Sequence, residues 1–251
     1  MGTDKTADNT EEDIHKNLNG YSALTRKLLI NRGITREEEA DRFLNPDYER
    51  DIHDPFLILF MQKAVDRILQ AIDAKENIII YGDYDCDGIP GSVIMHDFFK
   101  KIGYRNFENY IPHRHKEGYG LNIPAVEQFA EKGVTLLITV DCGITDVEEV
   151  ARAGALGIDV IVTDHHLPQE LLPNAFAILN SKQEGDTYPD NMLCGASVAW
   201  KLVSALLQKG SFDVPKGWEK WLLDMVGLST IADMVPLKNE NRVLAHYGLK
   251  V

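Results

Sequence analysis

Short apolar runs alternate with longer amphipathic stretches along most of the chain. Short runs of aliphatic or aromatic residues indicate strands at 77–82, 106–113, 134–140, 158–163 and 176–180. Between and after them, apolar residues recur at helical spacing, which predicts helices at 92–103, 123–133, 146–157, 196–210 and 217–235. Strands that alternate with helices are typical of βαβ crossovers, so the expected fold class is α/β, a mostly parallel sheet flanked by helices.

The residues before the first predicted strand have a different character. Residues 1–13 lack apolar periodicity, and we expect a disordered or artificial tail there. Helical spacing follows, with a capping-box pattern at Thr35 and Glu38. The expected organisation is therefore that tail, an N-terminal helical segment at 14–76 and a main domain at 77–251.

Composition narrows the classes of protein. No apolar run approaches the roughly 20 residues that span a bilayer, and the N-terminus is polar and acidic, so we expect a cytoplasmic protein without a membrane partner. The three cysteines are odd in number and far apart, which argues against a disulfide framework and a zinc ribbon. The net charge of −13 argues against non-specific coating of DNA, so any contact with nucleic acid must be local.

Three aspartates, Asp83, Asp85 and Asp87, follow the first predicted strand at alternate positions. Two unit charges about 4 Å apart repel by about 4 kcal/mol at the effective dielectric of a protein surface, so a bound cation is expected. The calcium-binding loop of an EF-hand has a similar spacing of aspartates. Here, however, its twelfth position would be Ile94 instead of Glu, and a predicted strand precedes the loop instead of a helix. The sequence therefore favours a different cation site.

Acids and imidazoles also follow two other predicted strands. Asp141 follows 134–140, and Asp164, His165 and His166 follow 158–163. The carboxyl ends of parallel strands share one edge of the sheet, so these side chains should converge. Carboxylates with imidazoles suit Mn²⁺ or Mg²⁺, and two ions about 3.5–4 Å apart could clamp a phosphate and activate a water. Single acids elsewhere, such as Asp146 and Asp159, are expected to be turn or helix-capping residues.

A basic loop follows the second predicted strand and offers candidates for substrate binding. Arg114 could grip a phosphate as a bidentate donor, and Tyr119 could stack on a base, within a turn made by Gly118 and Gly120. By charge alone, the same segment could equally be a solvated loop. Ser92 opens the predicted helix at 92–103, where free amides favour phosphate.

Four short sequences occur in order along the chain: DYDCDG, VDCGI, VTDHH and TIADMVPL. They resemble the four ordered motifs of the DHH phosphoesterase superfamily. Surrounding segments such as EEEADRFLNP and YIPHRHKEGYGL narrow the resemblance to RecJ-like single-strand-specific exonucleases. The similarity runs from about Leu24 to the end of the chain.

The resemblance implies a role for each matching residue. The metal ligands would be Asp83, Asp85, Asp87, Asp141, His165 and Asp233, with Asp141 shared by both ions. His166 would orient or stabilise the phosphate, and Asp164 would hold the histidines. Asp233 rests on the resemblance alone, because it lies in a predicted helix and not at a strand end.

The implied activity is a metal-dependent phosphodiesterase. Two Mn²⁺ or Mg²⁺ ions would activate a hydroxide that degrades single-stranded DNA from its 5′ end to 5′ mononucleotides, in DNA repair and recombination. The expected partner is single-stranded nucleic acid, DNA rather than RNA. Two alternatives stay open: a DHH phosphoesterase for short oligonucleotides, pyrophosphate or polyphosphate, and a non-catalytic replication-scaffold relative. Such exonucleases carry further domains that would follow Val251, so we expect an excised core or a truncated product.

Overall fold

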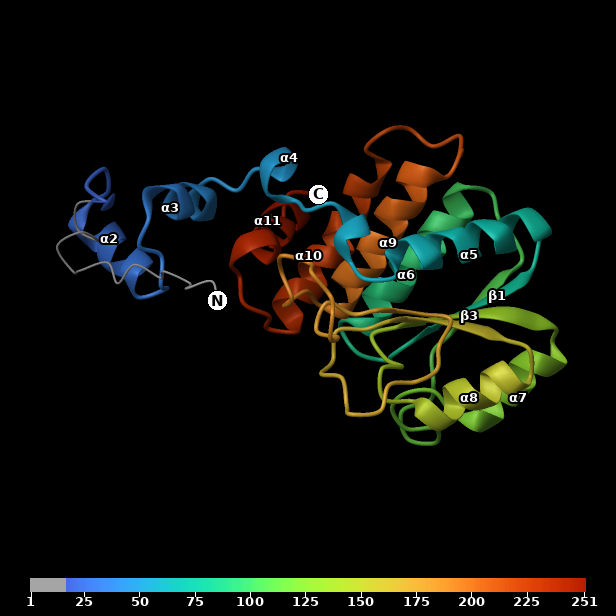
Figure 1. Ribbon diagram of the computed structural model, residues 1–251. Helices are drawn as coiled ribbons and strands as arrows, with labels where there is room; N and C mark the ends of the chain where they lie inside the picture. The colour runs from blue at the N-terminus through green and yellow to red at the C-terminus, as the bar shows by residue number, and fades with distance from the viewer. Residues whose placement is uncertain (1–16) are drawn as a thin grey trace, which may run out of the picture. The chain divides into compact units, whose positions relative to one another are not determined.

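The computed structural model describes residues 17–251, which fall into two compact units divided between Ile52 and His53 (Figure 1). The first unit contains α2 (Ala23–Ile30), α3 (Glu37–Leu44) and α4 (Tyr48–Asp51). The predicted tail at 1–13 lies outside the described residues, and the predicted domain boundaries stay a prediction.

The first unit is a small helical body with a core of its own. Buried Leu18, Leu29 and Ala40 form the centre of this core. The predicted capping box was wrong by one residue, because the N-cap of α3 is Arg36 and its partner is Glu39. The Glu39 carboxylate accepts the Arg36 backbone N–H at 3.4 Å and also pairs with the Arg36 guanidinium, a charged bond that Thr35 could not offer.

The second unit is built on a five-stranded sheet in which every strand pair is parallel. The strands are β1 (Asn77–Gly82), β2 (Phe107–Tyr110), β3 (Val134–Val140), β4 (Asp159–Thr163) and β5 (Ala177–Leu179), in the spatial order β2-β1-β3-β4-β5. This confirms the predicted α/β class. The register aligns Gly82 with Val140, Val140 with Thr163, and Thr163 with Leu179. The residues that follow these four strands therefore lie at one edge of the sheet.

Helices cover both faces of the sheet (Figure 1). One face carries α7 (Ile123–Glu131) and α8 (Val147–Ala155), and the other carries α5 (Met61–Ala74), α6 (Gly88–Lys101) and α9 (Gly195–Lys209). Because both faces are covered, the strands are apolar along their length; Ile78, Ile79 and Ile80 are all buried. Helix α9 is buried over most of its length, so its position is fixed by packing on all sides.

The remaining helices close the second unit at its C-terminal side. The single helix predicted at 217–235 is instead the 3₁₀ turn η2 (Trp218–Leu222) followed by α10 (Leu223–Ala232), and α11 (Asn239–Gly248) was not predicted. A second 3₁₀ turn, η1 (Pro55–Leu57), precedes α5. Within residues 17–251, no helix is long and apolar enough to cross a membrane.

A buried ion pair joins α9 to α11. Lys201 and Glu240 are both fully buried and pair through Nζ and Oε1. The other oxygen of Glu240 accepts the Tyr188 hydroxyl, and Oε1 also accepts the His53 backbone N–H at 3.0 Å. Both charges are therefore paired and hydrogen-bonded, as burial requires.

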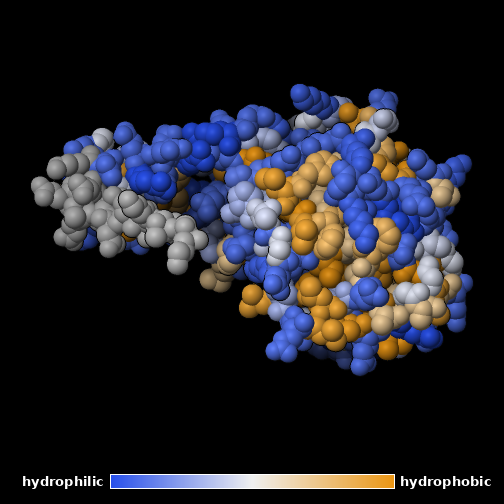
Figure 2. All heavy atoms as spheres, in the orientation of Figure 1, coloured by the Kyte–Doolittle hydropathy of each residue, from blue (hydrophilic) through white to orange (hydrophobic). Residues whose placement is uncertain are grey.

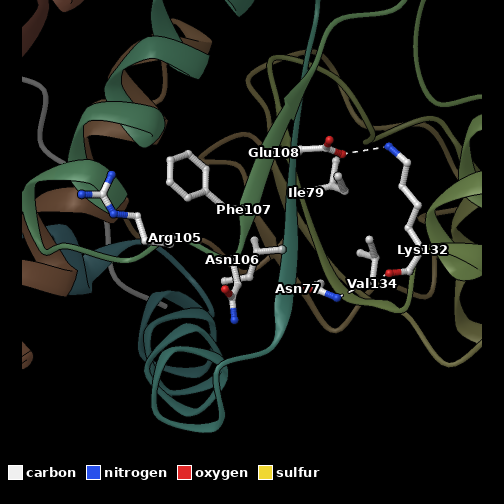
Figure 3. Close-up of a pocket in the computed structure, with 9 residues that line it drawn as sticks. Asn77, Ile79, Arg105, Asn106, Phe107, Glu108, Lys132 and Val134 are labelled. Atoms are coloured by element: carbon white, nitrogen blue, oxygen red, sulfur yellow. Dashed lines mark hydrogen bonds and ion pairs between the residues drawn. The ribbon is translucent and has the colours of Figure 1, made fainter.

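A hollow of 340 Å³ lies at the amino ends of β1, β2 and β3 (Figure 3). Asn77, Phe107 and Val134, which begin these strands, line it together with Lys132, whose ammonium is 2.9 Å from Glu108. This is the opposite end of the sheet from the predicted acids, and no predicted site residue lines the hollow. Apolar side chains are also exposed between hydrophilic ones on the face shown in Figure 2.

Candidate metal centre

The loop after β1 places its three aspartates in different environments. Asp83 and Asp87 are buried, whereas Asp85 is exposed. Asp85 Oδ1 accepts the backbone N–H groups of Asp87 at 2.7 Å and Gly88 at 2.9 Å, which starts α6 at Gly88. The predicted start at Ser92 was therefore wrong by four residues, because the first-motif loop itself supplies the acceptor for the free amides of this helix.

Ser92 lies in the second turn of α6 instead of at its first residue. Its hydroxyl is buried, has no hydrogen-bond partner, and lies 1.8 Å from where a Cβ on Gly82 would stand. Gly82 must therefore be glycine for α6 to pack this closely on β1. Since the helix begins at Gly88, the reason for choosing Ser92 is lost, and its contact with phosphate stays a prediction.

Asp87 is held by the amino end of α9. Its two carboxylate oxygens accept the backbone N–H groups of Gly195 at 2.5 Å and Ala196 at 2.7 Å. Both amides belong to the first turn of α9, where they have no partner within the helix and where the helix dipole favours an anion. A Cβ on Gly195 would stand 2.7 Å from the Cβ of Asp141, so a glycine is required here. The start of α9 thus contacts two of the predicted ligands at once.

Asp141 directly follows β3 and is almost wholly buried. Its backbone is left-handed, with φ of 61°, a conformation that Asp tolerates better than most residues. Oδ1 lies 3.2 Å from His165 Nε2, and the Asp141 carbonyl accepts the Tyr119 hydroxyl at 3.1 Å. The turn therefore aims this carboxylate at the histidines.

The segment after β4 is organised by Asp164, which is fully buried. Its carboxylate accepts the backbone N–H groups of Ile144 at 2.9 Å and His165 at 2.7 Å, and lies 2.8 Å from His166 Nδ1. Burial alone would raise the pKa of Asp164, but these hydrogen bonds outweigh it and hold the pKa below its usual range. The hydrogen bond from Asp164 in turn raises the pKa of His166, which favours the protonated imidazole.

His165 faces the carboxylates from the other side. Nε2 is 3.6 Å from Asp87 Oδ2, and Nδ1 is 3.8 Å from Asp233 Oδ2. Burial lowers the pKa of His165 and so favours the neutral imidazole, the form that binds metals. Asp233 is the C-cap of α10, and the same helix donates the Ser229 hydroxyl to the Cys86 carbonyl at 3.1 Å. Helix α10 thus delivers Asp233 and also holds the first-motif loop.

These side chains form three overlapping groups, in each of which the candidate ligand atoms lie within 4.8 Å of one another. The groups are Asp83, Asp85 and Asp141; Asp87, His165 and Asp233; and Asp141, His165 and His166. Burial, followed by the nearby charges of Asp87 and Asp85, raises the pKa of Asp141 far above its ordinary value. The charges are thus crowded to a degree that a cation would relieve.

The donor set fits divalent cations. Three of the buried polar atoms without a hydrogen-bond partner are Asp83 Oδ1, Asp141 Oδ1 and His165 Nδ1. Buried polar atoms are rarely left without a partner, and all three belong to predicted metal ligands. Carboxylate oxygens with one or two imidazoles are the ligands of Mn²⁺ and, with fewer imidazoles, of Mg²⁺. Asp141 belongs to two of the groups, which suits a ligand shared by two ions.

Three of the predicted substrate residues, Gly118, Tyr119 and Gly120, lie on a turn beside these acids. Gly118 and Gly120 both have φ of 81°, which favours glycine, and Tyr119 between them is half exposed with its hydroxyl 3.2 Å from His166 Nδ1. The Arg114 guanidinium lies 5.0 Å from the centre of the Tyr84 ring, in the first-motif loop. The turn thus brings Tyr119 next to His166, while Arg114 lies against the loop after β1, and the contacts of both residues with substrate stay predictions.

Asp146 anchors the turn at Gly118–Gly120 through the backbone of the residue that follows it. It occupies the N-cap position of α8, as expected, but its carboxylate accepts the Leu121 backbone N–H at 2.7 Å instead of capping the helix. The Tyr81 hydroxyl donates to the Gly120 carbonyl at 2.8 Å, which fixes the turn at a second point. Burial raises the pKa of Asp146 to about 6.

Sequence reasoning missed two residues that follow β5. Asn180 is buried and donates Nδ2 to the His166 carbonyl at 2.9 Å, and the Lys182 ammonium donates to the His165 carbonyl. The signal was available, since both residues follow a strand of the same sheet that was predicted at 176–180, but neither residue was given a role. Asn180 therefore fixes the backbone of His166, and Lys182 fixes that of His165.

A model of the DHH family, N-terminal domain, matches residues 77–230, which include all of the predicted ligands except Asp233. The chain belongs to the DHH family. The resemblance inferred from the four motifs is thereby confirmed. The family match begins with β1 and runs to α10, so it covers the strands and helices that build the metal centre.

Curated relatives within the DHH family share most of this chain. The single-stranded-DNA-specific exonuclease RecJ of Bacillus subtilis is 46% identical over 228 residues, which are 90% of this chain and 28% of that protein. RecJ of Escherichia coli is 36% identical over 90% of this chain and 40% of its own length. The chain thus spans less than half the length of these relatives.

Solved structures of RecJ exonucleases resemble this chain in fold. A crystal structure of exonuclease RecJ bound to manganese matches with a TM-score of 0.69 and 32% identity, over 77% of this chain and 48% of that one. RecJ from Thermus thermophilus in complex with Mn²⁺ matches with a TM-score of 0.74 and 26% identity, over 95% of this chain and 32% of that one.

Proposed function

We propose that this chain is the metal-dependent nuclease unit of a RecJ-like enzyme. It would hydrolyse single-stranded DNA from the 5′ end with two Mn²⁺ or Mg²⁺ ions and release 5′ mononucleotides. The observation that carries the proposal is the convergence of three strand ends and α10 on ligand groups no wider than 4.8 Å, with three buried ligand atoms unpartnered. The names of the relatives support the substrate and the ions.

The proposed ligands divide between two ions. Asp83 and Asp85 would hold one ion, Asp87, His165 and Asp233 would hold the other, and Asp141 would contact both. When bound, divalent cations would supply positive charge that polarises a phosphoryl oxygen and lowers the pKa of an attacking water. In-line attack by the water oxygen would form a new bond to phosphorus and break the bond between phosphorus and the 3′ oxygen of the terminal nucleotide, which would take a proton and leave as a 3′ hydroxyl. The protein contributes fixed geometry, because every ligand sits on packed secondary structure or on a hydrogen-bonded loop.

His166 would hold a proton for the phosphate. Its Nδ1 faces Asp164 at 2.8 Å, and the raised pKa favours the imidazolium, so Nε2–H is left to donate to a phosphoryl oxygen. The side chain is half exposed, unlike that of His165, and is therefore open to substrate. Asp164 acts through His166 by fixing the ring and favouring its charge.

We propose single-stranded DNA rather than RNA as the partner, and a role in DNA repair and recombination, on the same likeness to RecJ. A cytoplasmic location is also proposed, and the three cysteines, all free in the structure, support it.

The test is hydrolysis of a single-stranded oligonucleotide, labelled at the 5′ end or the 3′ end, in Mn²⁺, Mg²⁺ and chelator. We expect the 5′ label to appear first as a mononucleotide, only with metal, and Asp141→Asn to lose at least a hundredfold in rate. Asp97→Asn, which changes an exposed carboxylate on α6, is the matched control.

Parallel reactions with pyrophosphate and a dinucleotide separate the alternatives. Hydrolysis of these small substrates without degradation of longer strands would replace the exonuclease proposal with the small-substrate one. Absence of Mn²⁺ binding in calorimetry would reject both and favour a scaffold role.

A further inference from the structure

Lys182 is a basic residue that contacts the backbone of His165 and for which no role was predicted. It follows β5 by three residues, so it lies at the same edge of the sheet as the acids. Its ammonium donates to the carbonyl of His165, and its charge interacts with Asp233 and with both histidines. Lys182 is half-buried, so part of its surface remains accessible to solvent.

The backbone that carries Lys182 is fixed. The Lys182 N–H donates to Asn180 Oδ1 at 2.9 Å, and the next amide, of Gln183, donates to the Asn180 carbonyl at 3.1 Å. The Gln183 side chain donates to the Ile178 carbonyl at 2.8 Å. Asn180 itself is fully buried and bonded to the His166 carbonyl. The turn therefore presents the lysine from a rigid base.

The ammonium of Lys182 retains unused bonding capacity. A lysine has three N–H donors, and one of them is used on the His165 carbonyl. Within the described chain, Lys182 forms no ion pair with a carboxylate, whereas Lys201, Lys209 and Lys132 each do. A free charge beside a phosphate-binding centre is positioned to accept an anion.

We propose that Lys182 is a phosphate-binding residue of the metal centre. This inference rests on the proposed function. Its ammonium contacts a non-bridging oxygen of the phosphate beside His165, whose carbonyl it already contacts, whereas Arg114 lies beside the loop after β1, 5.0 Å from the Tyr84 ring. Such positive charges are needed because the DNA backbone must approach a crowd of carboxylates. The ligand class is a phosphodiester of single-stranded DNA or the nucleoside monophosphate left after cleavage.

The test compares Lys182→Met and Lys182→Arg with wild type, using the full chain. The probes are thymidine 5′-monophosphate with Mn²⁺ bound to the protein, thymidine as the phosphate-free control, and a short oligothymidylate with Ca²⁺ in place of Mn²⁺, so that the strand is not cleaved. Lys132→Met is the matched control, because it removes a lysine at the opposite end of the sheet.

We expect Lys182→Met to bind thymidine 5′-monophosphate roughly tenfold more weakly, as loss of one charged hydrogen bond predicts. The slope of log affinity against log salt for the oligothymidylate should become shallower by about 0.7, the value for one phosphate contact on a single strand. Lys182→Arg should recover both quantities to within about threefold, and Lys132→Met should leave them unchanged. Mn²⁺ affinity should not fall in Lys182→Met, since a positive charge is removed from beside the ions.

Two results would overturn the proposal. One is an unchanged salt slope in Lys182→Met together with weakened Mn²⁺ binding, which would mean that the lysine only holds the His165 backbone. The other is equal binding of thymidine and its monophosphate by wild type. Because these readouts need no cleavage, an inactive wild type would reject the nuclease proposal while thymidylate binding still decides the role of Lys182.

Discussion

Replacing Asp141 by Asn should stabilise the metal-free protein. The ligand atoms of Asp83, Asp85 and Asp141 lie within 4.8 Å of one another. At that separation and an effective dielectric of about 20, each ionised pair repels by about 3.5 kcal/mol. The chain avoids this repulsion by keeping a proton on Asp141, as its strongly raised pKa indicates. Keeping that proton at pH 7 on a group with an ordinary pKa of 3.8 costs about 4 kcal/mol, at about 1.4 kcal/mol per pH unit.

Asn removes this cost with little other change. It has the same shape as Asp and also tolerates the left-handed backbone at this position. We therefore expect Asp141→Asn to raise the free energy of unfolding by about 2–4 kcal/mol in chelator, on the order of the cost just derived. In Mn²⁺ this difference should narrow, because wild type gains binding free energy, about 4.1 kcal/mol at a thousand times the Kd, and the variant gains less.

Urea unfolding followed by tryptophan fluorescence measures both quantities. All three tryptophans, Trp200, Trp218 and Trp221, lie in the unit that contains the metal centre, so the signal reports on that unit. Asp97→Asn controls for loss of an exposed carboxylate and should change stability by less than about 0.5 kcal/mol. If Asp141→Asn were less stable than wild type in chelator, the carboxylates would not be in electrostatic conflict and the reasoning would be wrong.

Three further outcomes follow from contacts around the centre. Gly195→Ala should weaken Mn²⁺ binding at least tenfold by calorimetry, because its Cβ would displace Asp141 and the N–H that holds Asp87. Gly154→Ala, in α8 with open space where its Cβ would stand, tests for a general effect of losing a glycine. Lys201→Met should lower the free energy of unfolding by about 3–5 kcal/mol, since Glu240 would stay buried without its cation, and adding Glu240→Gln should recover part of the loss in urea titrations. For Asp146, the folded chain keeps its proton up to pH 6 whereas the unfolded chain releases it near 3.8, so stability present below pH 3.8 is lost as the pH rises to 6. The stability difference between wild type and Asp146→Asn should therefore shift by at most about 3 kcal/mol between pH 4 and pH 7, and a constant difference would contradict the raised pKa.

Strand periodicity located most of the centre, because a parallel sheet converts position along the sequence into position in space. Asp83, Asp141 and the segment after β4 were found in this way, since each follows an apolar run whose end is in register with its neighbours. Lys182 obeys the same rule, since it follows β5, which was predicted at 176–180. It was given no role because no acid or imidazole directly follows that strand.

Other features of the centre depend on tertiary contacts that no local pattern encodes. Asp233 enters from the end of α10, and only family resemblance pointed to it. The grip of α9 on Asp87 joins residues 108 positions apart in sequence. The start of α6 was misplaced because glycine and proline at 88–91 suggested a loop, whereas Asp85 caps free amides there. A segment of low helix propensity can still form the first turn of a helix when a side chain from outside the helix accepts its free backbone N–H groups.

The alignment of four strand ends at one edge also has a kinetic consequence. The ligands come from segments as distant as Asp83 and Asp233, so the centre is complete only when β1, β3, β4 and α10 have all docked. Contacts of such long sequence separation form late in folding. Bound ions should therefore slow unfolding and leave the refolding rate almost unchanged. The metal then determines the lifetime of the folded state and not the rate at which it forms.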